Sequence, residues 1–287
     1  MPKDALSSVR AAARKCRACD LWKCGTQTVF GEGSPETAVR RWKSGMVEAV
    51  LFDLGDTLVH FETSRARHFL NTGTRPSYDR LCELGFRPPR YPVYRRAMKS
   101  AFLKALVWSR LSRREAQLFE AFHRRHERLG MLLTTSQMAD LVLRCVTPLR
   151  QFFQVDDEAV GVVSALKNAG LKLGLISNTL FPGFVIDDVL EYDGLLPWFP
   201  VRVYSSDVGF MKPHRQIFET ALRRLGVPPE RTLIVGDNLR KDIGGGSRMG
   251  MRTILMAKNG WSPRGRVRPD HTIRRLAEIP PLIQALA

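Results

Sequence analysis

The stretch VLFDLGDTLV, residues 50–59, sets a short apolar run directly before two aspartates, Asp53 and Asp56, with Gly55 between them. A short run rich in Val, Leu and Phe that ends in Gly and Asp is typical of a buried strand, which we expect over residues 48–54. A carboxylate at the end of such a strand is a candidate for catalysis or for binding a metal ion. A helix or turn cap is the structural alternative for each aspartate.

Beyond this strand, the chain alternates between helical and strand patterns from about residue 157 onward. Strands are expected at LKLGLIS, VRVYSS, TLIVGD and RTILMA, with helices near 157–169, 183–191, 213–225 and 241–249. Strands that alternate with helices predict a parallel sheet of βα units, so the fold class is α/β, a Rossmann-like doubly wound parallel sheet. Active sites in such folds lie at the carboxyl ends of the strands.

A helical segment separates the first strand from the rest of this sheet. Between Pro76 and about Phe153, apolar residues recur at near-helical spacing, as in Tyr94, Met98 and Phe102. We therefore expect an α-helical cap domain over residues 61–152, inserted into a core made of residues 46–60 and 153–287. Residues 1–45 form a separate N-terminal extension.

Composition limits the class of protein and its compartment. The chain has 287 residues, 44% of them hydrophobic, and no apolar run long enough for a membrane span or a signal peptide. Five cysteines, an odd number, favour a reducing compartment. We expect a cytoplasmic protein that does not bind membranes, with an organelle transit peptide at the basic N-terminus as the weaker alternative.

The net charge of +17 is concentrated outside the predicted core. Residues 61–152 hold 18 Lys and Arg against 7 Asp and Glu, whereas the core segments hold 18 against 17. A basic module suggests an anionic substrate or a nucleic-acid surface, and a solvated basic helix face is the alternative. Because Phe119 and Phe122 fall on the apolar face of their helix, core packing is favoured for them over base stacking, and nucleic acid is not the expected partner.

Polar groups follow the predicted strands in a pattern that suits phosphoryl transfer. Two carboxylates, Asp53 and Asp237, offer the hard oxygen ligands that Mg²⁺ accepts. A hydroxyl, an amide and an ammonium group can bind phosphate oxygens, and these are supplied by Ser177, Asn178 and Lys212.

The motifs DLGDT, SNT, MKP and GDNLRKD, in this order, resemble the four motifs of the haloacid dehalogenase superfamily of phosphatases, over residues 46–287. The resemblance implies that Asp53 is the nucleophile and forms an aspartyl phosphate, and that Ser177 binds the transferred phosphoryl group. It implies that Lys212 neutralises the charge of the nucleophile and of the phosphate. It also implies that Asp237 holds Mg²⁺ with support from Asp242. The expected substrate is a small phosphorylated metabolite, and the oligomeric state is left open.

Gly55 departs from the pattern of this superfamily. The superfamily places an acid/base aspartate two residues after the nucleophile, where Gly55 has no side chain but still offers a backbone carbonyl to the metal. Asp56, one residue later, is the candidate replacement. A low-activity or non-catalytic phosphate-binding protein is therefore the alternative function. Dehalogenation is a further option of the fold, which the paired acids Asp237 and Asp242 do not favour.

The segment SVRAAARKCRACDLWKCGTQTVFGEG, residues 8–33, resembles the N-terminus of the iron–sulfur uracil-DNA glycosylases. A cluster needs four protein ligands, but only Cys16 and Cys19 match and Cys24 lies off the pattern. We expect either a fused remnant or a start placed upstream of Met46, rather than a working repair domain. A zinc contact from two cysteines has no further support in the sequence.

Overall fold

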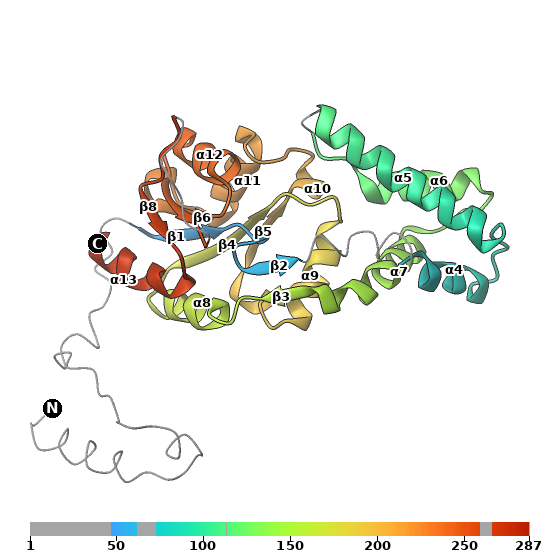
Figure 1. Cartoon of the computed structure of the whole chain (residues 1–287), viewed down its shortest axis with the longest axis horizontal. Helices are drawn as coiled ribbons and strands as arrows, with labels where there is room; N and C mark the ends of the chain where they lie inside the picture. The colour runs from blue at the N-terminus through green and yellow to red at the C-terminus, as the bar shows by residue number, and fades with distance from the viewer. Residues whose placement is uncertain (1–46, 62–72, 113, 259–265, 287) are drawn as a thin grey trace, which may run out of the picture. The chain divides into compact units, whose positions relative to one another are not determined.

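The computed structural model of the chain describes residues 47–61, 73–112, 114–258 and 266–286 (Figure 1). Its centre is a six-stranded sheet whose neighbouring strands are all parallel, in the order β5-β4-β1-β6-β7-β8. The strands are β1 (Ala49–Phe52), β4 (Lys172–Ser177), β5 (Val201–Tyr204), β6 (Thr232–Gly236), β7 (Arg252–Met256) and β8 (His271–Ile273). The predicted fold class is confirmed, and β8 is a strand that the pattern did not predict.

Helices cover both faces of this sheet (Figure 1). Helices α11 (Arg215–Leu225) and α12 (Gly244–Arg248) lie on one face, and α8 (Ala159–Asn168) and α13 (Ile279–Leu286) lie on the other. Because β1 is central and covered on both sides, all four of its residues are buried. This burial explains its continuous apolar sequence, since a strand with one solvated face would alternate polar and apolar residues.

Two glycines of α12 allow close packing of this helix. A Cβ added to Gly245 would lie 2.4 Å from the Phe218 ring, and one added to Gly246 would lie 2.5 Å from Ile234. The glycine-rich sequence at 244–246 therefore serves helix packing.

The topology places β1 at the point where the strand order reverses. β1 pairs with β4 on one side and with β6 on the other, so that Phe52 aligns with both Leu175 and Val235. The residues that follow these three strands consequently meet at one edge of the sheet. Ligands of doubly wound sheets bind in the crevice at this switch point.

The segment between β1 and β4 is mainly helical. It contains α4 (Thr74–Glu83), α5 (Tyr91–Ser112), α6 (Leu118–Arg128) and α7 (Thr135–Val146), followed by a 3-10 helix at Thr147–Phe152. These helices share an apolar core of their own, which also receives Val185 from α9 (Gly183–Tyr192). The buried stripe of α5 consists of Tyr94, Met98, Ala101 and Ala105, while the predicted Phe102 is only partly buried.

A short two-stranded ribbon frames this helical segment. Strand β2 (Val59–Phe61) pairs antiparallel with β3 (Phe153–Val155), one directly before and the other directly after the insertion. The sequence pattern did not predict this ribbon, because three-residue strands carry too few positions to show a period. Among the described residues, no helix combines the length and the apolar run that a bilayer crossing requires.

Candidate active site

The Asp53 carboxylate lies at the carboxyl end of β1 and is held by Lys212. Asp53 is 8% exposed and Lys212 is 3% exposed. The Lys212 ammonium donates to Asp53 Oδ1 at 2.6 Å and to the Ile176 carbonyl oxygen at 2.8 Å, and it lies 2.7 Å from Asp242 Oδ1. Two of these contacts are hydrogen bonds and the third is an ion pair, and together they hold the ammonium against the Asp53 carboxylate.

Three carboxylates gather at this edge of the sheet. Asp53, Asp237 and Asp242 each offer an oxygen, and these oxygens all lie within 4.8 Å of one another. Asp237 follows β6 directly, whereas Asp242 is fully buried and lies in the helical turn Leu239–Ile243. The backbone N–H of Asn238 donates to Asp242 Oδ2 at 3.0 Å. Gly236 leaves room for Asp242, because a Cβ there would lie 2.5 Å from the Asp242 carboxyl carbon.

The charges of this group do not balance among themselves. Three ionised carboxylates against one ammonium group leave two negative charges in a largely buried place. Burial raises the pKa of Asp53, Lys212 lowers it in part, and the charge of Asp237 adds to the rise. Burial likewise raises the pKa of Asp237 and of Asp242. A divalent cation with a preference for oxygen ligands fits both the donor set and the excess charge.

Lys212 carries a positive charge despite its burial. Burial lowers the pKa of Lys212, but the carboxylates of Asp242 and Asp53 outweigh this effect, and the pKa is raised overall. The group is therefore an ammonium at neutral pH. It can attract an anion to the Asp53 carboxylate.

Ser177 and Asn178 end β4 beside this pair, and they differ in what they contact. Asn178 holds the Lys212 backbone from both sides, since its Oδ1 accepts from the Lys212 N–H at 2.7 Å and its Nδ2 donates to the Lys212 carbonyl at 3.0 Å. The Ser177 side chain is buried and has no hydrogen-bond partner among the described residues. Ser177 thus keeps its hydroxyl available, whereas the Asn178 amide is engaged with the backbone of Lys212.

Gly55 and Asp56 occupy a tight turn after Asp53. The Asp56 N–H donates to the Val59 carbonyl at 2.8 Å, and Asp56 has a left-handed φ of 56°. The side chain of Asp56 is 68% exposed and lies 3.6 Å from His60 Nδ1. Asp56 is not one of the three carboxylates that could hold a metal ion. The structure therefore does not place it with Asp53 and Asp237 as a metal ligand.

A contact between the helical segment and the core lies beside this edge and was not predicted. Glu115, which precedes α6, is buried and accepts a hydrogen bond from Ser205 Oγ at 2.5 Å. The same Ser205 oxygen accepts from the Thr179 N–H at 2.8 Å, one residue after Asn178. The sequence around Glu115 is rich in charges and resembles a solvated helix, so no local signal identifies its burial.

Comparison with known proteins assigns the family. The family model for haloacid dehalogenase-like hydrolases matches residues 47–250. The chain belongs to this hydrolase family. The match and the described residues both begin at residue 47. Residues 8–33, which resemble uracil-DNA glycosylases, lie outside both.

Two relatives and one solved structure illustrate the similarity of this haloacid dehalogenase-like hydrolase to known proteins. It is 43% identical over 93 residues to glyceraldehyde 3-phosphate phosphatase of Methanothermobacter thermautotrophicus, covering 32% of this chain and 39% of that protein. It is 30% identical over 161 residues to pyrophosphatase PpaX of Bacillus mycoides, covering 52% of this chain and 72% of that protein. The phosphatase of Thermococcus onnurineus from the same superfamily superposes with a TM-score of 0.54 at 25% identity, over 83% and 98% of the two chains. The first relative is thus matched over much less than two thirds of its length.

Proposed function

We propose that this hydrolase is a phosphatase that transfers the phosphoryl group of a small phosphorylated metabolite to Asp53. The observation that carries the proposal is the buried Asp53 carboxylate, fixed 2.6 Å from the Lys212 ammonium at the switch point of the sheet. The two relatives named above are phosphatases by name, which supports the same reaction class.

In the proposed reaction, an Asp53 carboxylate oxygen attacks phosphorus, and the bond from phosphorus to the leaving oxygen breaks. Lys212 offsets the negative charge that the incoming phosphate brings to the carboxylate, and the Ser177 hydroxyl donates to a phosphate oxygen. Asn178 acts through Lys212, because its amide is bonded to the Lys212 backbone on both sides. Water then attacks phosphorus, and the bond to Asp53 breaks, which restores the carboxylate and releases phosphate.

A Mg²⁺ ion would be held by Asp53, Asp237 and the backbone carbonyl of Gly55, with Asp242 supporting the site. The three clustered carboxylates fit this ion, since their charge exceeds that of Lys212 by two. When bound, Mg²⁺ neutralises charge on the phosphoryl oxygens. Asp242 contributes from the protein side by holding Lys212 at 2.7 Å and the Asn238 backbone at 3.0 Å.

The leaving oxygen needs a proton and the attacking water needs a base, and Gly55 supplies neither. Asp56 is the nearest carboxylate along the chain, but its side chain is 68% exposed and paired with His60. We therefore propose that hydrolysis of the aspartyl phosphate is slow, and that Asp56 takes part only after a change in its turn.

The test is a rapid-mixing measurement with an activated aryl phosphate, in Mg²⁺ and in EDTA. We expect a stoichiometric burst followed by a slow steady state, both dependent on Mg²⁺. Asp53→Asn should lower the burst rate by about 10³-fold or more, because it removes the attacking oxygen. The control, Asp157→Asn, removes an exposed carboxylate outside the cluster and should leave the burst unchanged.

Two outcomes would contradict this function. Phosphate binding without a burst would leave the alternative, a phosphate-binding protein that does not turn over its ligand. A burst that persists in Asp53→Asn would remove Asp53 from the reaction.

A further inference from the structure

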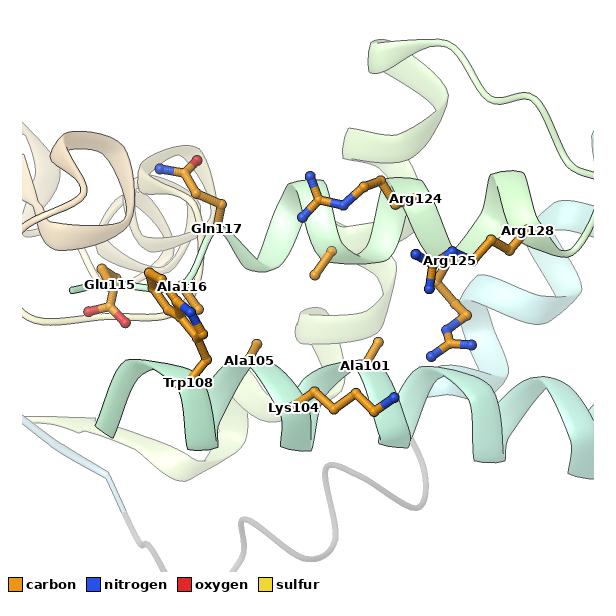
Figure 2. Close-up of a pocket in the computed structure, with 11 residues that line it drawn as sticks. Ala101, Lys104, Ala105, Trp108, Glu115, Ala116, Gln117, Arg124, Arg125 and Arg128 are labelled. Carbon is orange, nitrogen blue, oxygen red and sulfur yellow. The ribbon is translucent and has the colours of Figure 1, made fainter. Parts of the chain in front are cut away.

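A second candidate site lies between two helices of the insertion (Figure 2). It is a cavity of about 400 Å³ between α5 and α6, and none of the carboxylates of the candidate active site lines it. The lower wall comes from α5 and the upper wall from α6 (Figure 2). The cavity has the size of pockets that bind small organic molecules.

Three basic side chains line this cavity. Lys104 comes from α5, and Arg125 and Arg128 come from α6 (Figure 2). Within the described ranges of the chain, none of these three side chains has a carboxylate within 4.0 Å or a hydrogen bond. Like charges that face one another repel, so this arrangement favours an anion between them.

The acidic residues near the cavity do not supply this anion. Glu115 lines the opposite end, where its carboxylate accepts from Ser205 Oγ at 2.5 Å and from Ser109 Oγ at 3.2 Å (Figure 2). Glu120 lies 4.0 Å from Arg124, which is a fourth cation at the rim. Among the described residues, the positive charge of Lys104, Arg125 and Arg128 is therefore not offset by a carboxylate.

The lining also includes an indole and four alanines, beside the polar Gln117. Trp108 is 49% exposed although it belongs to a helix with a well-packed opposite face. Four alanines of α5, α6 and the loop between them keep the space open, namely Ala101, Ala105, Ala116 and Ala121. An exposed indole beside small side chains provides a surface on which a planar ring can stack.

We propose that this cavity binds an organic anion that carries a planar apolar body and at least two negative charges, a class represented by the nucleoside diphosphates. The planar body lies against Trp108 and the alanines, and the charged end lies among Lys104, Arg125 and Arg128. None of the residues of the Asp53 centre lines this cavity.

Isothermal titration of the full-length protein with adenosine diphosphate tests the proposal. Saturable binding at one site is expected, weaker at high salt because charge dominates the recognition. Adenosine alone and inorganic phosphate alone should each bind at least about tenfold more weakly, since each makes only part of the contacts.

Variants then locate the binding. Arg125→Gln with Arg128→Gln, and separately Trp108→Ala, should weaken it by about tenfold or more. The matched control, Arg96→Gln with Lys99→Gln, removes two exposed charges of α5 that do not line the cavity and should leave affinity unchanged. Equal thermal stability of all variants shows that they are folded. No saturable binding, or binding that survives the Arg125 and Arg128 changes, would overturn the proposal.

Discussion

Gly55 is the residue on which the rate of the proposed reaction depends most. In the turn after Asp53, this position has no side chain that could act as the acid/base. A Cβ at Gly55 would meet no atom within 4 Å, and its φ is not in the left-handed range. The turn therefore has room for a side chain at this position.

We predict that Gly55→Asp raises the steady-state rate with an activated aryl phosphate by about 10²-fold or more, which is the usual gain from a positioned acid/base group. The added carboxylate can activate the water that releases phosphate, so the burst should merge into the steady state. Gly55→Asn is the matched control, because it has the same size but cannot exchange a proton at neutral pH. An equal gain from both variants would show that the effect is one of turn geometry.

Asp56 supplies the complementary measurement at this turn. Because its exposed side chain is paired with His60 and lies outside the carboxylate cluster, Asp56→Asn should change the steady state less than about threefold. The same rapid-mixing assay measures this change. A loss of turnover in Asp56→Asn would show that the turn rearranges and brings Asp56 to the phosphate.

Helix α6 carries a buried histidine whose protonation opposes folding. His126 is 2% exposed, with Nδ1 at 2.7 Å from the Phe122 carbonyl and Nε2 at 3.1 Å from the Tyr94 hydroxyl. Both ring nitrogens are thus used by the neutral imidazole, which donates from Nδ1 and accepts at Nε2. Burial lowers the pKa of His126 below its ordinary value of 6.5.

The lowered pKa of His126 predicts how the stability of the fold changes with pH. Below pH 6.5 the unfolded chain binds a proton that the folded chain does not yet bind, so stability is lost as the pH falls through this range. We predict that the melting temperature of the wild type falls more steeply between pH 7.5 and 5.5 than that of His126→Gln, which does not titrate. Scanning calorimetry of both proteins at the two pH values measures the difference, and the carboxylates common to both cancel. Parallel curves would exclude His126 as the cause.

At the scale of the whole molecule, the family match and the described elements all lie after residue 46. We predict that a chain beginning at Met46 folds with the melting temperature and burst of the full-length protein. Full-length protein that shows the visible absorption of an iron–sulfur cluster, or a shortened chain that fails to fold, would contradict this prediction.

The sequence pattern predicts five of the six strands of the sheet and their order along the chain, but not β8. Apolar runs such as 49–52 and 232–236 are bounded by Gly, Asp and Ser, and each run is buried on both faces, so its pattern does not depend on any single distant contact. Asp53, Ser177 and Asp237 were candidate site residues because polar groups at the carboxyl ends of parallel strands meet at one edge of the sheet, although each alone could cap a turn or helix.

Only the tertiary structure decided what these residues touch. Asn178 was predicted to bind phosphate, but its side chain bonds to the backbone of Lys212, and a hydrogen bond between residues 34 apart leaves no local sequence pattern. Asp56 lies toward His60, and its left-handed φ leaves no local pattern either. The hydrogen bond of Glu115 with Ser205 joins separate elements, and Lys104 and Arg125 of different helices line one cavity. Local periodicity reports which face of an element is buried, whereas the partner on that face is set by how the elements pack.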